Sequence, residues 1–308
     1  MYYFIVNPMS SRGRGEKIWR KLEDQLRRAG VEYEAMLTEK PGDAGRIAEA
    51  LTKYCREPRT IVAVGGDGTV NEILNGLAFE GQITLGYIPT GVCNDLARSL
   101  RLPISPRRCL KKVLNSKTYK NLDYGVLTYE KGEPEHRRFM VCSGIGLDGA
   151  ICHNFLDIRS KSVHRRIGIG RLGYMMLGLK QLAMTGPVKG YLILDGTKKV
   201  EFNHIYSIST HIHPYEGGGF KIAPKANGED GRLEICVIQN SRKLDLLPMM
   251  AGVLLGSVGR HRGMRFFSCS EVQIHVDAPR AVHVDGESCF SQTDIQLCCI
   301  ARKIRMIL

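Results

Sequence analysis

The sequence predicts an α/β + β protein of two domains, a doubly wound α/β domain over residues 1–125 and a β-sandwich or barrel domain over residues 126–294. Before residue 125, short apolar runs alternate with helical patterns, and a strand followed by a helix recurs four times, which is typical of a parallel sheet. After residue 125, short strand-like runs are separated by turn signals, which indicates antiparallel strands. The chain has 308 residues, too many for one small core.

The elements of the first domain follow from hydrophobic periodicity. Residues 2–6 form a first buried strand, and the helix after them carries Ile18, Leu22 and Leu26 on one face and ends at Gly30. The same pattern predicts three further strand–helix pairs: residues 31–37 with 42–55, 60–66 with 69–79, and 83–89 with 94–100. Ligands of such sheets bind at the carboxyl ends of the strands.

The second domain is predicted from six strand-like runs and two helical interruptions. The runs are residues 137–146, 190–196, 206–212, 233–239, 271–277 and 281–287. The helical stretches lie near residues 151–184 and 242–258. The last run, residues 295–308, could finish either domain and is a candidate to complete the first.

Composition limits the class of partner and the cell compartment. The net charge of +13 and the pI near 9.3 indicate an acidic partner such as a nucleotide, a nucleic acid or an anionic membrane. The ten cysteines follow no metal-ligand spacing and no secreted framework, so we expect reduced thiols, with Cys142, Cys152 and Cys236 buried, in a cytoplasmic protein. No signal peptide and no run of about 18 apolar residues is present.

Two glycine motifs invite a dinucleotide-binding interpretation that their context excludes. Residues 144–149 (GIGLDG) and 168–173 (GIGRLG) both satisfy G-x-G-x-x-G. The first lies in the β-rich half without a βαβ unit, and the second follows no strand. A P-loop motif and the protein-kinase signature set are also missing from the sequence.

A third glycine-rich stretch, VAVGGDGTV over residues 62–70, has the context of a phosphate site. It passes from a strand through a glycine turn into a helix, whose N-terminus favours an anion. A tight turn with an N-cap aspartate is the alternative. Residues 88–100 and 7–15 also leave strands through small residues and arginines, so the three strand ends together indicate one polyanion site.

At this point the motifs resemble the diacylglycerol kinase catalytic family. Five stretches occur in the family's order: VAVGGDGTVNEILNGL, PTGVCNDLAR, SGIGLDGAI, APKANGEDGRLEICVI and VDGE. The resemblance as a whole covers nearly the whole chain, from Asn7 to Glu287. The likeness is closest to bacterial soluble lipid kinases, which also resemble sphingosine and ceramide kinases. It implies a nucleotide-binding α/β domain, a β-sandwich domain and an active cleft between them. The glycine–aspartate motif alone is shared with NAD kinases and phosphofructokinases.

The resemblance also implies site residues and cofactors, which are ATP and Mg²⁺. The nucleotide side would comprise Asn7, Ser11, Arg14, Thr38, Gly65, Gly66, Asp67, Gly68, Thr69, Asn94 and Arg98. The catalytic magnesium network would comprise Asp67, Asp95 and Asp123, and Asp230 would be a ligand of a structural magnesium. The segment around Asp230 also suits a plain hairpin.

The VDGE motif supplies the implied catalytic carboxylates, with Asp285 as the general base and Glu287 beside it. A hydroxyl acceptor needs a base within hydrogen-bond reach. A type I′ or II′ hairpin turn is the alternative, because Asp-Gly favours such turns, and a turn can present a base. His211 and His213 share a strand face and could bind metal, but no third ligand is evident, so we assign none.

The chain departs from the family pattern at three places. Val92-Cys93 replaces a pair of small residues, so nucleotide contact by the Val92 side chain is doubtful. Residues 146–149 (GLDG) replace a glycine–phenylalanine–aspartate–alanine run and leave the role of Asp148 open. Arginines stand in residues 7–15 where a lysine is frequent, and they hold phosphate with different geometry.

A basic and apolar segment is the candidate membrane surface. Its cations are Arg159, Lys161, Arg165, Arg166 and Arg171, and the apolar residues 174–179 follow them. Such a combination suits an anionic bilayer, although a core helix with a solvated arginine collar explains it nearly as well. Nucleic acid is not expected, because no recognisable binding module is present.

These observations predict an ATP- and magnesium-dependent lipid kinase, cytoplasmic and peripherally associated with the membrane. Diacylglycerol is the default acceptor, and undecaprenol, phosphatidylglycerol, ceramide and sphingoid bases stay open. An NAD kinase-like enzyme and a non-catalytic lipid- or nucleotide-binding regulator are the alternatives. A homodimer is compatible with the sequence, which does not fix the oligomeric state.

Overall fold

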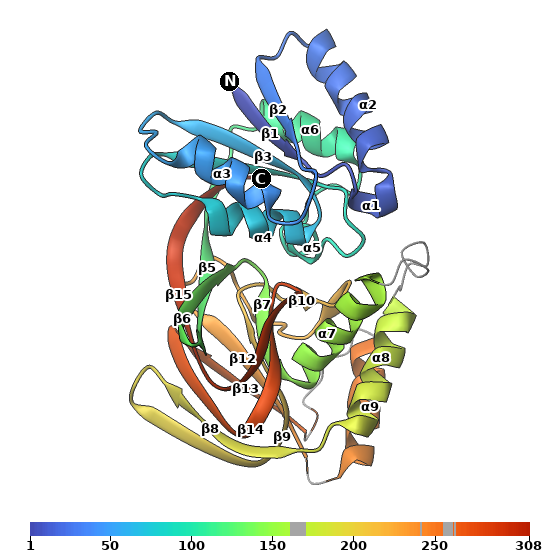
Figure 1. Cartoon of the computed structure of the whole chain (residues 1–308), viewed down its shortest axis with the longest axis vertical. Coiled ribbons are helices and arrows are strands. Elements are labelled where there is room, and N and C mark those ends of the chain that lie inside the picture. The colour runs from blue at the N-terminus through green and yellow to red at the C-terminus, as the bar shows by residue number, and fades with distance from the viewer. Residues whose placement is uncertain (161–170, 241, 255–260, 262) are drawn as a thin grey trace. The chain divides into compact units, whose positions relative to one another are not determined.

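The computed structural model describes residues 1–160, 171–240, 242–254, 261 and 263–308. They form two compact units, Met1–Leu122 with Arg302–Leu308 (unit 1) and Asp123–Ala301 (unit 2). Unit 1 is α/β and unit 2 is rich in antiparallel strands, so the predicted fold class is confirmed (Figure 1). The units divide between residues 122 and 123, and the end of the final run belongs to unit 1.

Unit 1 is built on parallel strands in the order β4-β3-β1-β2, with the end of β15 beside β4. The strands are β1 (Tyr2–Val6), β2 (Tyr33–Leu37), β3 (Arg59–Gly65) and β4 (Ile83–Pro89). The helices are α1 (Ser10–Gly13), α2 (Gly15–Arg28), α3 (Asp43–Thr52), α4 (Asp67–Gly76), α5 (Asp95–Ser99) and α6 (Pro106–Asn115). The four strand–helix pairs predicted from the sequence are therefore present.

Helices cover both faces of the unit 1 sheet because alternate strand residues point to opposite sides. Phe4 and Val64 pack with Trp19 of α2 and Leu110 of α6 in one core. Helices α3 and α4 pack on each other and on β1 and β3 (Figure 1). Each large apolar side chain buried in this way contributes about 1.5–3 kcal/mol.

The strands of unit 2 are antiparallel, and all but the separate β10-β11 pair belong to the sheet that contains β14. They are β5 (Tyr119–Lys131), β6 (Glu133–Phe139), β7 (Cys142–Gly146), β8 (Val188–Leu194), β9 (Lys198–His211), β10 (Tyr215–Glu216), β11 (Phe220–Lys221), β12 (Leu233–Gln239), β13 (Met264–Cys269), β14 (Glu271–Val284) and β15 (Glu287–Ile307). β14 pairs with β7, β8 and β15, while β9 pairs with β7, β8 and β12.

Helices α7 (Leu147–Ser160), α8 (Arg171–Met184) and α9 (Leu247–Leu254) gather on one side of the unit 2 strands (Figure 1). The short helix η1 (Lys243–Leu246) directly precedes α9, and these elements lie at the positions predicted from the sequence. Ile151 of α7, Leu182 of α8 and Met249 of α9 share a core with Tyr206 of β9. This core fixes the first half of α7 directly after β7.

Candidate functional site

Polar side chains follow the carboxyl ends of all four parallel strands of unit 1. Val6 pairs with both Leu37 and Val64, so these three strands end at one level, where Asn7 and Thr38 follow. The order β3-β1-β2 places the topological switch point between β1 and β3, where ligands of doubly wound sheets bind. The predicted nucleotide residues on these loops therefore lie at the expected edge.

Side-chain hydrogen bonds tie the loops of this edge together. Asn7 Nδ2 donates to Thr69 Oγ1 at 3.2 Å, which bridges the loops after β1 and β3. The hydroxyls of Ser10 and Thr90 lie 2.7 Å apart, which bridges the loops after β1 and β4. The amide of Thr38 donates to the Val6 carbonyl. The structure thus brings together residues that the sequence places up to 80 positions apart.

The glycines of the predicted motif allow backbone segments to approach closely. A Cβ on Gly65 would overlap the Thr69 side chain, and one on Gly91 would lie 2.6 Å from Gly66 Cα. The turn after β3 and the turn after β4 therefore face each other without side chains between them. Gly68 lies in the first turn of α4, whose N-cap is Gly66.

The Asp67 side chain connects helix α4, which carries it, with the start of helix α5. Its Oδ2 accepts the Asp95 amide at 2.9 Å, and its Oδ1 accepts the Leu96 amide at 3.2 Å. Asp67 therefore caps the N-terminus of α5, where the helix dipole favours a negative charge. This geometry places the Asp67 carboxylate beside the backbone of Asp95, and the magnesium network stays a prediction.

A buried tyrosine that the sequence analysis did not single out supports this carboxylate. Tyr87 Oη lies 3.5 Å from Asp67 Oδ1 and 3.3 Å from Asn94 Oδ1, and the hydroxyl can donate to one of them at a time. Burial and the nearby Asp67 charge raise the pKa of Tyr87 well above its usual value. Asn94 Oδ1 also accepts the Gly91 amide at 3.0 Å. The hydroxyl therefore stays protonated and can donate to either loop.

The cationic residues predicted for the nucleotide side lie on the same loops. Arg14 Nε donates to the Ser11 carbonyl at 3.3 Å, at the surface. Ser11 and Arg12 have positive φ angles of 53° and 62°, which non-glycine residues adopt only when their surroundings impose them. Arg98 lies on α5, within the helix that Asp67 caps. Val92 is exposed.

The donor set of Asp67 and Asp95 suits magnesium, because both offer the carboxylate oxygens that Mg²⁺ prefers. Each Asp67 oxygen already accepts an amide, which leaves lone pairs for metal-bound water. Asp123 is the first residue of unit 2 and is fully buried. Its Oδ2 accepts the Gly231 amide at 2.7 Å, so Asp123 organises the loop before β12.

Asp230, the predicted ligand of a structural magnesium, lies in the same loop. It accepts the amide of Arg232 at 3.0 Å and lines a pocket of about 190 Å³ with Asn227 and Glu234. Lys225 and Arg232 also line the pocket, so it mixes both signs of charge. The magnesium assignment at Asp230 stays a prediction.

The VDGE motif forms the turn between β14 and β15. Asp285 and Gly286 both have positive φ angles, 47° and 90°, as a type I′ turn requires, so the turn interpretation is confirmed. Asp285 Oδ2 accepts the Met140 amide at 2.8 Å, and Oδ1 accepts those of Val141 and Cys142 at 2.9 and 3.0 Å. A carboxylate offers about four lone-pair sites, so these amides leave at most about one for a further donor.

Helix α7 holds this turn from the other side. Cys152 Sγ donates to the Gly286 carbonyl at 2.9 Å, and His153 Nε2 lies 2.8 Å from Ser288 Oγ. Asp148 Oδ2 lies 2.8 Å from Nε2 of His283, two residues before Asp285. Asp285 is therefore fixed by neighbours on both sides.

The sequence did not predict that Asp148 and His283 form a pair, although Asp148 lies in the GIGLDG motif and His283 directly precedes VDGE. A Cβ on Gly144 would overlap Asp148 Oδ2 and lie 2.8 Å from His283 Nε2, so the glycine makes room for the pair. Burial disfavours the charged ring, but the Asp148 carboxylate outweighs burial and raises the pKa of His283. Burial likewise opposes ionisation of Asp148, yet His283 holds the pKa of that carboxyl well below its usual range. The two form a buried ion pair.

His211 and His213 are buried core residues. Burial lowers the pKa of each ring to about 4, so both are neutral at pH 7. His211 Nε2 lies 2.9 Å from Ser209 Oγ and 3.6 Å from Glu216 Oε2. The ring of His213 packs over Gly228, where a Cβ would lie 2.5 Å from its Cε1.

Three of the five predicted membrane cations lie outside the residues that the structure describes. Lys161, Arg165 and Arg166 are outside the described residues, and Arg159 and Arg171 are described only as positions in α7 and α8. Among the described residues, no helix has the length and apolar character needed to cross a membrane. All ten cysteines are thiols, and Cys142, Cys152 and Cys236 are buried as predicted.

Comparisons with known proteins agree with this architecture. Residues 1–126 match the family model of the diacylglycerol kinase catalytic domain, and residues 156–306 match that of the YegS C-terminal NAD kinase beta sandwich-like domain. A diacylglycerol kinase of Bacillus subtilis (strain 168) is 27% identical over 285 residues, which cover 92% of this chain and 88% of that protein.

Solved structures show the same fold. A diacylglycerol kinase from Bacillus anthracis str. Sterne aligns with a TM-score of 0.70 at 20% identity, over 99% of this chain and 96% of that one. Another structure from that organism reaches 0.76 at 22% identity, over 99% and 94% of the two chains. With both family models matched in order along the chain, the protein belongs to the diacylglycerol kinase catalytic domain family.

Proposed function

We propose that this member of a lipid kinase family transfers the γ-phosphate of ATP to a lipid hydroxyl at a membrane surface, with diacylglycerol as the default acceptor. The observation that carries the proposal is the strand-end arrangement of unit 1, where Asp67 caps α5 beside Asp95. Two carboxylates beside a phosphate would repel the anion unless a cation stands between them, so their presence supports a bound cation.

The residues of unit 1 would bind and orient the nucleotide. The glycine turns after β3 and β4 let backbone amides approach the phosphates, and Arg14 and Arg98 add positive charge. Asp67 and Asp95 would hold Mg²⁺ through their oxygens, and Mg²⁺ when bound supplies charge neutralisation at the phosphates. The Tyr87 hydroxyl, 3.5 Å from Asp67 Oδ1, would help to keep that carboxylate in place.

The turn of unit 2 would handle the acceptor proton. As the acceptor oxygen forms its bond to the γ-phosphorus and the bond to ADP breaks, the hydroxyl proton passes to Asp285. The amides of residues 140–142 orient this carboxylate before the acceptor arrives. Glu287 is exposed next to the turn and adds a second negative group.

The assay that tests the proposal offers ATP labelled at the γ-phosphate with separate acceptors. Vesicles containing diacylglycerol, vesicles of phosphatidylglycerol alone, NAD in solution and no acceptor form the four arms. We expect label in the lipid phase only with diacylglycerol. Label on NAD with none on lipid would favour the NAD kinase-like alternative, and ATP binding without any transfer would favour a non-catalytic regulator.

An Asp285→Asn variant tests the assignment of the base. We expect kcat to fall by about 10²–10⁴-fold while KM for ATP changes little. Asp277→Asn, at an exposed aspartate of β14, is the matched control and should keep full activity. Asp285 also orders residues 140–142, so a circular dichroism spectrum checks that the Asp285→Asn variant is folded. Glu287→Gln, which removes the neighbouring carboxylate, is measured beside it. Full turnover by Asp285→Asn would remove the base assignment.

Vesicle sedimentation tests the membrane surface. Binding to anionic vesicles should weaken as salt rises and should fall in an Arg165→Glu, Arg166→Glu variant. The control reverses Arg107 and Arg108, an exposed basic pair on α6 of unit 1. Binding insensitive to salt and to the Arg165–Arg166 change would contradict the proposal.

A further inference from the structure

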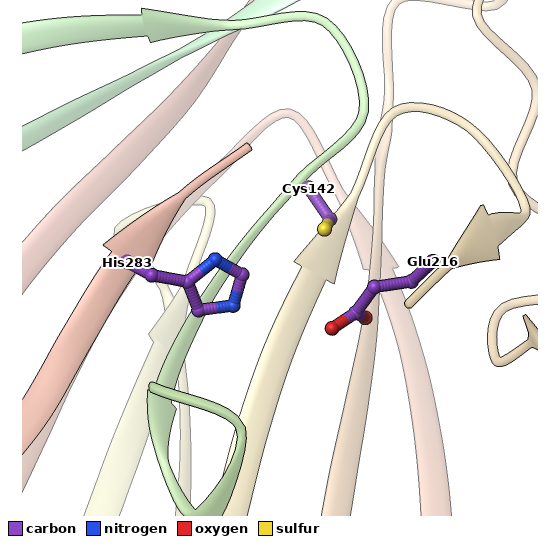
Figure 2. A group of neighbouring side chains, drawn as sticks. All are labelled: Cys142, Glu216 and His283. Carbon is purple, nitrogen blue, oxygen red and sulfur yellow. The ribbon is translucent and has the colours of Figure 1, made fainter. Parts of the chain in front are cut away.

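Behind the turn that carries Asp285, buried donor side chains from three strands converge on one point. Donor atoms of Cys142 on β7, Glu216 on β10 and His283 on β14 all lie within 4.8 Å of one another (Figure 2). The exposed fractions of the three residues are 3%, 8% and 3%. They form the one such group of histidine, cysteine and acidic ligands within the part of the chain that the structure describes.

The backbone around the group is suited to hold it in place. Cys142 is fixed at both backbone atoms by Asp285, whose Oδ1 accepts its amide and whose amide donates to its carbonyl. Glu216 precedes three glycines with positive φ, residues 217–219, which close the short hairpin of β10 and β11. His283 lies in the paired part of β14, opposite Gly144 of β7. The three donors therefore come from separate, hydrogen-bonded elements.

Charged side chains surround the three donors. Asp148 forms an ion pair with His283 and hydrogen-bonds to the Glu216 side chain, so these two carboxyl groups share a proton, and Glu216 Oε2 lies 3.6 Å from His211 Nε2. Two acidic side chains and a thiol thus meet two imidazoles away from water. Buried negative groups are costly unless they share a proton or coordinate a metal.

The donor types select the kind of metal. A thiolate sulfur with an imidazole nitrogen and a carboxylate oxygen suits Zn²⁺ and similar cations, whereas Mg²⁺ and Ca²⁺ prefer oxygen alone. Donors around a zinc ion lie about 3.3–3.8 Å apart, given metal–ligand distances of about 2.0–2.3 Å. Binding would therefore draw the three donors closer together than the spacing of up to 4.8 Å seen here. Asp148 beside His283 Nε2 matches the carboxylate that commonly orients a metal-binding histidine.

We propose that Cys142, Glu216 and His283 bind one divalent cation of the zinc type, with Asp148 beside the ring. The cation would tie β7, β10 and β14 together behind the Asp285 turn. It would be separate from the magnesium proposed in unit 1. The inference does not depend on kinase activity, since it rests on the donor cluster alone.

Cobalt binding to the full chain tests the site. Protein stripped with a chelator is titrated with Co²⁺, and bound metal is counted by mass spectrometry after gel filtration. We expect about one tight Co²⁺ per chain with a sulfur-to-cobalt charge-transfer absorption, displaced by Zn²⁺ but not by a large excess of Mg²⁺. No bound Co²⁺, or binding without the sulfur band, would overturn the proposal and would leave a shared proton as the neutralising group.

Matched variants assign the ligands. Cys142→Ser should lose the sulfur band, and Glu216→Gln should weaken binding by at least about tenfold while the band persists at saturation. Cys269→Ser, at a fully buried thiol on β13 outside the cluster, should bind as the parent protein does. A band that survives Cys142→Ser would also overturn the assignment. If the protein shows kinase activity but binds no Co²⁺, only this inference is refuted. If it binds Co²⁺ at this site but shows no kinase activity, only the proposed function is refuted.

Discussion

Two buried histidines, His211 and His213, make the stability of unit 2 fall at acid pH. His211 and His213 are buried, and burial lowers the pKa of each to about 4. The unfolded chain protonates its histidines near pH 6.5, whereas the folded rings stay neutral until about pH 4. Above pH 6.5 the two states bind the same number of protons at these residues. Stability is therefore lost as pH falls from about 6.5 to about 4.

A His213→Phe variant should lose less stability than the parent protein as pH falls from about 6.5 to about 4. Phenylalanine keeps a ring over Gly228 and removes one titrating group whose Nε2 has no hydrogen-bond partner among the described residues. Relative to the parent, the free energy of unfolding should rise by about 2–3 kcal/mol between pH 7 and pH 4.5. Urea unfolding at pH 7, 5.5 and 4.5 measures it. Parallel pH profiles for the two proteins would contradict the prediction.

Strained residues mark the same loops as the candidate site. Ser11, Arg12, Asn94 and Asp285 all have positive φ, in the turns that follow β1, β4 and β14. A non-glycine residue in this region costs about 1–3 kcal/mol, so its neighbours must impose it. Asn94 is held by its bonds to Gly91, and Asp285 by the amides of residues 140–142. The strain is consistent with a functional role for these turns.

At the level of elements, α5 is a short helix whose start depends on a side chain from another helix. Its N-cap, Asn94, makes no side-chain capping bond, and Asp67 of α4 supplies the acceptors instead. A five-residue helix has little intrinsic stability, so this tertiary cap decides its position.

Asp67→Asn should loosen α5 and weaken nucleotide binding together. The new amide would point an N–H at one backbone donor, at a cost of about 1–2 kcal/mol, and the charge for Mg²⁺ would be lost. We expect the Kd for ATP with Mg²⁺ to rise by at least about tenfold, measured by calorimetry. Asp24→Asn, at an exposed position of α2, is the control. An unchanged Kd would remove Asp67 from the site.

On the scale of the whole molecule, the two units carry separate cores and separate parts of the proposed chemistry. The predicted nucleotide residues lie in unit 1, and Asp285 with the buried cluster lies in unit 2. The long strands β5 and β15 each run through both units.

Hydrogen exchange should therefore locate the nucleotide. With ATP and Mg²⁺, we expect added protection in residues 7–15, 65–76 and 90–99, because the loops at the strand ends of unit 1 would order around the phosphates. The core strands of unit 2, such as β8 and β12, should exchange as before. Protection confined to residues 225–234 would place the nucleotide elsewhere and contradict the assignment.

Much of the fold was predictable because its signals are local. Apolar periodicity gave the four strand–helix pairs of unit 1 and the helical stretches of unit 2, since each depends on residues close in sequence. The glycine–aspartate turn and the VDGE turn were predictable for the same reason. The division at residues 122 and 123 was not, because β5 crosses it without any break in its strand pattern.

By itself, the sequence determined the fold class, the loops that carry the site and the family to which the chain belongs. Only the tertiary structure decided which side chains meet: Asp67 with the amides of α5, Tyr87 with Asn94, Asp148 with His283, and Cys142 with Glu216. Most of these partners come from different elements, and their meeting depends on strand register and helix packing. A local pattern specifies which face a residue takes, but only the packed sheet specifies what that face meets.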